Sequence, residues 1–139
     1  MARIIHIDGP DKTGKDSIRR EVVSNSEGTA MVYVRSFLSQ IVYSRLYNRE
    51  INEDWFLAKW YRAFNLGEEF HFTDCSYEMV KERFILHNEM DLDIKDWENH
   101  RKVFYDVLKE AEELGIEVKR INTTSDTISM SALKIQREL

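Results

Sequence analysis

Two glycines and a lysine near the N-terminus have the residue types and the spacing of a loop that binds phosphate. Gly9 is followed by four residues and then by Gly14 and Lys15, which is the P-loop pattern. Glycines let successive backbone N–H groups converge on an anion, and the lysine reaches the outer phosphates of a nucleoside triphosphate. We therefore predict that ATP binds at this loop. Its predicted nucleotide-binding residues are Gly9, Pro10, Thr13, Gly14, Lys15, Asp16, Ser17 and Ile18.

Asp16 stands where the P-loop usually carries the Ser or Thr whose hydroxyl binds Mg²⁺. A carboxylate is a good ligand for a hard cation, so Asp16 could hold Mg²⁺ directly or through water. Alternatively, Ser17 supplies the hydroxyl, and Asp16 is a favourable anionic group in the first turn of a helix. The sequence leaves both alternatives open, and Asp16 and Ser17 are both candidate Mg²⁺ ligands.

The elements that must position this loop flank it, and similar elements follow along the chain. Runs of β-branched and aromatic residues, typical of strands, alternate with apolar residues at helical spacing. We expect Asn52 and Ser76 to cap helices and Gly115 to end one. The predicted strands are 3–8, 29–34, 69–75 and 116–122, and the predicted helices are 15–23, 36–50, 52–66, 76–89, 94–115 and 125–139.

This alternation predicts a three-layer α/β fold, with a small, mostly parallel sheet of four or five strands and helices on both faces. In such sheets ligands bind beyond the carboxyl ends of the strands. The residues that follow the predicted strands are all polar or belong to the loop: the segment from Gly9, then Arg35, Asp74 and residues 122–125. We therefore expect one functional cleft at this edge.

The chain has 139 residues, of which 42% are hydrophobic and 32% charged, and a net charge of −5. Its length and composition predict a single globular domain over residues 1–139. No apolar run is long enough to span a membrane, and Cys75 is the only cysteine, so we expect a cytoplasmic protein without a membrane partner. The negative charge disfavours tight nonspecific binding to nucleic acid.

Taken together, these motifs resemble the thymidylate kinase family of P-loop nucleoside monophosphate kinases, especially its compact phage-like members. In "IDGPDKTGKDS", Asp11 matches the family's acidic loop residue, and Lys12 stands where some members carry an arginine. In "VRSFLSQIVY", Arg35 and Ser39 match the family's Asp-Arg-x-x-x-Ser segment, but Val34 replaces its aspartate. The resemblance implies a P-loop kinase fold, ATP and Mg²⁺ as cofactors, and a host cytoplasm as location if a phage encodes the chain.

Two later segments also resemble parts of this family. Residues 81–108 are similar to its mobile lid and the following helix, with Arg83 as a lid arginine. The segment "INTTSD" occupies the place of the loop that contacts adenine, which implies that Asn122 and Thr123 bind the nucleotide. Most of the span that usually separates the P-loop helix from the arginine strand is missing. The acceptor pocket must therefore be built differently.

Phosphoryl transfer requires the protein mainly to position the reactants and to neutralise negative charge. The candidate residues for this work are Lys12, Lys15, Arg35 and Arg83. Asp11 could orient the acceptor or receive its proton. Both arginines also have a plain alternative, as surface residues that pair with carboxylates or stay in solvent.

Aromatic residues gather after Arg35. Phe37, Tyr43 and their neighbours could stack on a base. Trp55, Trp60 and Tyr61, at helical spacing, are expected in the core instead. These aromatic helices expose more apolar area than a small monomer buries, so a homodimer is plausible.

Three functions fit the sequence. The leading hypothesis is transfer of the γ-phosphate of ATP to a pyrimidine deoxynucleoside monophosphate. A second, suggested by phage relatives of the family, is phosphorylation of the hydroxymethyl group of a modified pyrimidine such as 5-hydroxymethyluracil, in a nucleotide or in DNA; the net charge does not favour DNA. The third is a protein that binds a nucleotide without turnover, as Asp16 and Val34 suggest.

Overall fold

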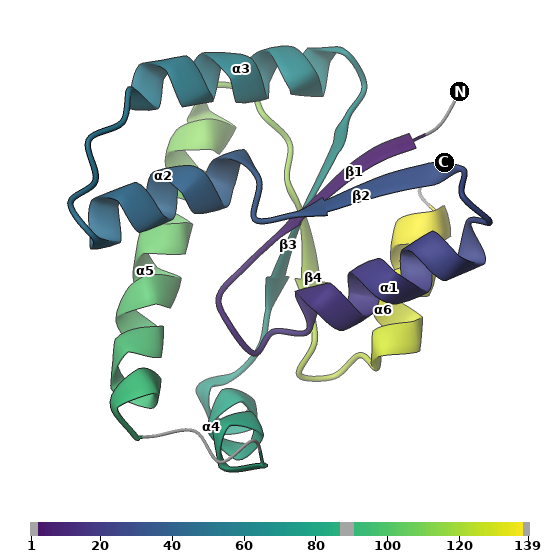
Figure 1. The fold of residues 1–139 in the computed structure, drawn as a ribbon, viewed down its shortest axis with the longest axis vertical. Helices are drawn as coiled ribbons and strands as arrows, with labels where there is room; N and C mark the ends of the chain where they lie inside the picture. The colour runs from purple at the N-terminus through teal and green to yellow at the C-terminus, as the bar shows by residue number, and fades with distance from the viewer. Residues whose placement is uncertain (1–2, 87–90, 138–139) are drawn as a thin grey trace.

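The computed structural model describes residues 3–86 and 91–137. Within these ranges the chain forms one four-stranded sheet in which every neighbouring pair is parallel (Figure 1). The order across the sheet is β2 (Ala30–Val34), β1 (Arg3–Asp8), β3 (Glu69–Asp74) and β4 (Lys119–Asn122). The predicted α/β class, with a parallel sheet of four or five strands, is confirmed.

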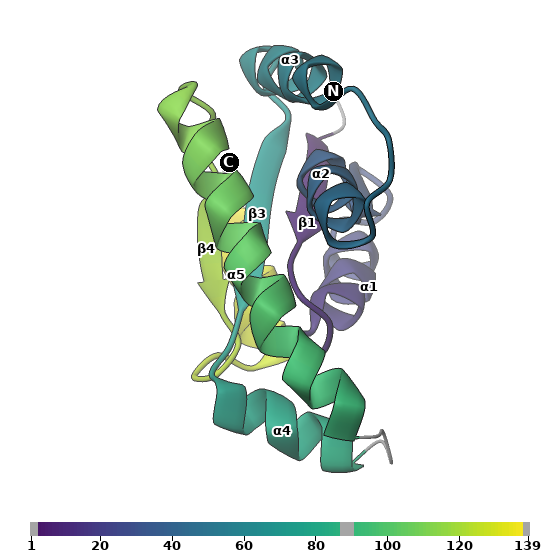
Figure 2. The same ribbon diagram turned by 90° about the vertical axis from the view of Figure 1, so that its left-hand side faces the viewer.

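Helices cover both faces of the sheet, which gives three layers (Figures 1 and 2). One face carries α1 (Lys15–Asn25) and α6 (Ile128–Arg137). The other face carries α2 (Phe37–Leu46), α3 (Glu53–Asn65) and the long α5 (Asp91–Glu113). The remaining helix, α4 (Tyr77–Leu86), lies beyond the carboxyl end of β3 (Figure 2).

The central strand β1 divides the apolar side chains between two cores. Because successive side chains of a strand point to opposite faces, Ile5 and Ile7 pack with α1 and α6, whereas His6 stacks on Phe70 at 4.5 Å on the other face. The core on the α2, α3 and α5 side is built around large rings, including Trp60, Phe70, Phe72 and Phe104. Burial on both faces of β1 fixes the strand that leads into the phosphate-binding loop.

Helix ends follow their predicted signals. The side chain of Asn52 accepts a hydrogen bond of 3.1 Å from the N–H of Trp55, and the Ser76 hydroxyl accepts one of 3.2 Å from the N–H of Met79. Gly115 follows α5 with a left-handed φ of 91°. Both predicted caps and the predicted helix end are confirmed.

Two elements near the C-terminus start later than predicted. The fourth strand starts at Lys119 instead of Ile116, because only residues 119–122 pair with β3. The last helix starts at Ile128 instead of Ser125, because the hydroxyl of Thr127 caps it by accepting a hydrogen bond of 3.1 Å from the N–H of Met130. Residues 87–89 of the predicted fourth helix and 138–139 of the last lie outside the described ranges.

The aromatic residues of α3 are divided between core and surface. Trp60 is 1% exposed, as predicted, but Trp55 is 51% and Tyr61 45% exposed, so their predicted burial is wrong. They lie on the side of α3 that faces solvent. Among residues 3–86 and 91–137, none of the helices combines the length and apolar character needed to cross a membrane.

Candidate active site

The loop that joins β1 to α1 is held tightly against β3. A Cβ atom on Gly9 would overlap the side-chain and carbonyl oxygens of Thr73, so only glycine fits there. Gly14 has a left-handed φ of 89°, which glycine adopts without strain. The buried hydroxyl of Thr13 lies 2.6 Å from the carbonyl of Pro10 and 2.7 Å from the hydroxyl of Thr73. Thr13 thus fixes the loop through its side chain, and any contact with a nucleotide falls to its backbone.

Lys15 begins α1 and is only 4% exposed. Its ammonium nitrogen lies 3.4 Å from the carbonyl of Pro10 and 3.8 Å from the carboxylate of Asp11. Burial lowers the pKa of Lys15 below the ordinary 10.5, and the nearby carboxylate of Asp11 opposes that shift. A buried ammonium with one partly exposed counterion gains strongly from an added anion such as a phosphate.

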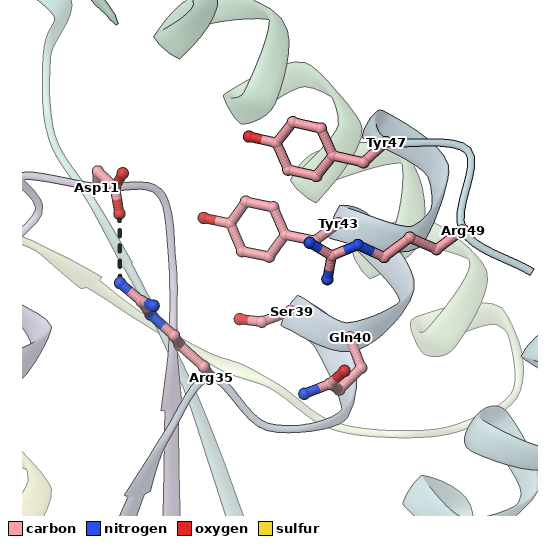
Figure 3. A pocket seen from close by; sticks show the side chains of 7 residues that line it. All are labelled: Asp11, Arg35, Ser39, Gln40, Tyr43, Tyr47 and Arg49. Carbon is pink, nitrogen blue, oxygen red and sulfur yellow. Dashed lines mark ion pairs between the residues drawn. The ribbon is translucent and has the colours of Figure 1, made fainter. Parts of the chain in front are cut away.

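Asp11 also pairs with the arginine that follows β2. Its carboxylate lies 3.9 Å from the guanidinium of Arg35, and both side chains are more than half exposed (Figure 3). Arg35 has a left-handed φ of 60°, a conformation that costs a non-glycine residue about 1 kcal/mol or more. This turn directs the chain from β2 into α2 and places Arg35 opposite the loop.

A cavity of about 600 Å³ opens at the loop and the start of α1. Both Asp16 and Ser17 line it, so the choice between them as Mg²⁺ ligand stays open. Ile18 is fully buried in the core, and only its backbone could contribute to the cavity. The residues that line this donor cavity are Asp11, Lys12, Gly14, Lys15, Asp16, Ser17, Arg20, Arg35, Arg83 and Ile128.

A second cavity of about 370 Å³ lies on the other side of Asp11 and Arg35, toward α2 (Figure 3). Its far wall is aromatic: the rings of Tyr43 and Tyr47 are stacked 6.0 Å apart, and the guanidinium of Arg49 lies 5.4 Å from the centre of the Tyr47 ring. The residues that line this second cavity are Asp11, Arg35, Ser39, Gln40, Tyr43, Tyr47 and Arg49. Asp11 and Arg35 therefore belong to both cavities.

The other predicted site residues are engaged in holding loops together. Arg83 donates hydrogen bonds to the carbonyl oxygens of Lys12 and Thr123, and it also lines the donor cavity. Thr123 is buried and bonds through its N–H to the carbonyl of Asp74 at 2.8 Å. The side chain of Asn122 accepts a hydrogen bond of 2.9 Å from the N–H of Thr124.

Asp8 was not predicted as a site residue, but it contributes a buried carboxylate at the end of β1, next to the phosphate-binding loop. It is 2% exposed and accepts hydrogen bonds from the Ser36 N–H at 2.7 Å and the Ser39 hydroxyl at 2.6 Å. Burial raises the pKa of Asp8 above the ordinary 3.8, although these bonds oppose the shift. Val34, which stands where the resembled family carries an aspartate, pairs with Ile7 of β1, and Asp8 is the next residue of that strand. Asp8 therefore supplies a carboxylate close to that position.

Sequence reading also missed Arg20, Gln40, Tyr47 and Arg49 as lining residues. The available signal was helical spacing, since residues 40, 43 and 47 lie on one face of a helix that starts after Arg35. Over the described part of the chain, no group of three His, Cys, Asp or Glu side chains could hold a metal ion. The carboxylate of Asp16 and the hydroxyl of Ser17 still suit a Mg²⁺ ion carried by nucleotide phosphates.

No protein-family model matches this sequence, and no curated protein matches it. Among solved structures, the chain is similar to the YorR protein of Bacillus subtilis, whose crystal structure is a complex with phosphorylated GDP. The TM-score is 0.81 over 96% of this chain and 93% of that one, at 13% sequence identity. The chain thus shares its α/β, P-loop kinase-like fold with that protein, whereas membership of the thymidylate kinase family stays a prediction.

Proposed function

We propose that this chain is a P-loop phosphotransferase that moves the γ-phosphate of ATP to the phosphate of a deoxynucleoside monophosphate. The observation that carries the proposal is the wall shared by the two cavities, where the carboxylate of Asp11 lies between Lys15 and Arg35. A donor in one cavity and an acceptor in the other would meet at these charges. The P-loop pattern and the similar fold of a protein solved with a phosphorylated nucleotide support this assignment.

In this proposal the loop and Lys15 bind the donor phosphates, and Arg35 and Arg83 neutralise the charge on the transferred group. An acceptor phosphate oxygen bonds to the γ-phosphorus as the bond from phosphorus to the β–γ bridging oxygen breaks, which releases ADP. Mg²⁺, bound by the phosphates and by Asp16 or Ser17, would offset negative charge. The reaction needs no strong base, since a phosphate acceptor already carries its negative charge.

The charges of the second cavity favour an anionic acceptor over an alcohol. Arg35 and Arg49 line it, and among the described residues that line it Asp11 is the only carboxylate. The carboxylate of Asp11 already pairs with Lys15 and Arg35 and is therefore engaged in ion pairs, instead of facing a hydroxymethyl group as its proton acceptor. The tyrosine pair offers a surface on which a base could stack. The pyrimidine preference rests on the resemblance to thymidylate kinases alone.

The test is an assay of ATP consumption with Mg²⁺ against a panel of acceptors. The panel holds thymidylate, deoxyuridylate, deoxycytidylate, deoxyguanylate, hydroxymethyl-deoxyuridylate and DNA containing hydroxymethyluracil. The proposal expects a nucleoside diphosphate from at least one monophosphate. Product phosphorylated on the hydroxymethyl group would establish the alternative acceptor, and ATP binding without any transfer would establish a nucleotide-binding protein.

A further inference from the structure

Three consecutive carbonyl groups of the phosphate-binding loop are each held by side-chain donors. The carbonyl of Pro10 accepts from Thr13 and Lys15, and that of Lys12 accepts from Arg83. Between them, the carbonyl of Asp11 accepts a hydrogen bond of 2.7 Å from the indole N–H of Trp97. Trp97 comes from α5, 86 residues further along the chain.

A donor on the Asp11 carbonyl fixes the next N–H as well. The peptide unit is planar, and its C=O and N–H point in opposite directions. Trp97 therefore directs the N–H of Lys12 away from itself. Lys12 has a left-handed φ of 65°, a strained conformation that persists only when its surroundings hold it. Loop N–H groups that converge in this way form an anion-binding nest.

Trp97 is well fixed for this purpose. It is 2% exposed and packs in a small apolar cluster with Cys75 and Val80, at the junction of α4 and α5. The only polar group of its indole is the N–H, which donates its hydrogen bond to the loop carbonyl of Asp11. By contrast, the buried Trp60 has no hydrogen-bond partner for its indole N–H among the described residues. Packing alone thus explains Trp60 but not the orientation of Trp97.

We propose that Trp97 is a positioning residue for the donor phosphates, which holds the Asp11–Lys12 peptide so that its N–H faces the donor cavity. The inference rests on the proposed function, because it assumes that the cavity takes a nucleoside triphosphate. It also couples α5 to the loop, so that the packing of this helix sets the geometry of phosphate binding.

The first test compares Trp97→Phe with Trp60→Phe. The second variant is a matched control, because it also loses a buried indole, but in the core on the α2, α3 and α5 side of the sheet. Loss of the hydrogen bond should weaken MgATP binding, measured by calorimetry, roughly three- to tenfold in Trp97→Phe and not in Trp60→Phe. The KM of the acceptor should stay unchanged. General loosening of α5 would instead raise the acceptor KM too, because Phe104 and His100 of α5 contact Tyr43 of the second cavity.

A second test needs no loss of Trp97. The chain has three tryptophans, so the variant Trp55→Phe/Trp60→Phe leaves Trp97 as the single tryptophan, whose emission can be excited selectively. Addition of MgATP should shift or quench its fluorescence. Unchanged emission at saturating MgATP, or equal MgATP affinity of wild type and Trp97→Phe, would overturn the positioning role while the proposed function stands. If the wild type binds no MgATP, the proposed function fails instead, and the inference fails with it.

Discussion

The carboxylate of Asp8 accepts a hydrogen bond of 2.6 Å from the hydroxyl of Ser39 and so joins the end of β1 to the first turn of α2. This contact connects the phosphate-binding loop with the segment that carries Arg35. Gly9 of the phosphate-binding loop follows Asp8, and Arg35 lies just before α2. The hydrogen bond between Asp8 and Ser39 therefore fixes the position of Asp11 relative to Arg35 in the wall that the two cavities share.

This buried carboxylate makes stability depend on pH. Because burial raises the pKa of Asp8 above 3.8 in the folded chain, the unfolded chain loses this proton first as pH rises. Asp8 therefore lowers the free energy of unfolding as pH climbs from about 3.8 through its folded pKa. Asp8→Asn should remove that decrease, so urea unfolding at several pH values should show the variant gaining on wild type. A constant difference between the two proteins across this range would contradict the account.

ATP binding should weaken at alkaline pH sooner than an ordinary lysine would allow. Burial lowers the pKa of Lys15 below 10.5, and the neutral amine cannot pair with phosphate. Once the pH passes the pKa of Lys15 in the free protein, the Kd for MgATP should rise toward tenfold per pH unit. Lys15→Ala, with a weaker but flat Kd over the same range, is the control. A parallel rise in both proteins would place the titrating group elsewhere.

Gly9, which follows β1, and Gly28, which lies two residues before β2, should respond differently to an added methyl group. Gly9→Ala must push the loop from Thr73, and we expect a destabilisation of several kcal/mol with loss of MgATP binding. At Gly28, with a φ of 82°, the methyl meets nothing within 4 Å. Gly28→Ala should therefore cost only the backbone strain of about 1–2 kcal/mol and leave ATP affinity unchanged. Calorimetric Kd values and unfolding curves separate the two effects.

The two cavities predict a crossed pattern of kinetic defects. Arg49 lines the second cavity but not the donor cavity, whereas Arg20 lines the donor cavity but not the second. Arg49→Ala should raise the acceptor KM severalfold with the ATP KM unchanged, since an exposed charged contact contributes about 1 kcal/mol. Arg20→Ala should do the reverse. Initial rates with each substrate varied in turn check this, and a reversed or shared defect would mean that the cavities are assigned wrongly.

Local sequence patterns were sufficient to predict most of the helices and strands. The buried run of β1, the Gly9–Lys15 spacing and the caps at Asn52 and Ser76 are short-range signals, and each matches the structure. The order of the strands was not predictable from them, because pairing depends on which apolar faces meet in space. The later starts of β4 and α6 reflect pairing with β3 and a cap at Thr127 that composition alone does not specify.

Site residues were predicted where the P-loop pattern or a strand end marks them, and they were missed where their role depends on contacts with a distant element. Lys15, Arg35 and Asp11 meet at one edge, as the parallel sheet required. Asp8 escaped notice because its role depends on α2 returning over β1, and Trp97 because its partner is a backbone carbonyl 86 residues away. Contacts of this kind arise from tertiary packing and leave no spacing to detect.

The central claim is transfer from a donor to an acceptor phosphate across the wall that the two cavities share at Asp11 and Arg35, with Lys15 in the donor cavity. The most direct measurement follows the γ-phosphate of labelled ATP, with Mg²⁺, into a panel of deoxynucleoside monophosphates, using wild type and Lys15→Ala. The account predicts labelled diphosphate with wild type and its loss in the variant. Absence of label from every monophosphate, while wild type still binds ATP, would contradict it.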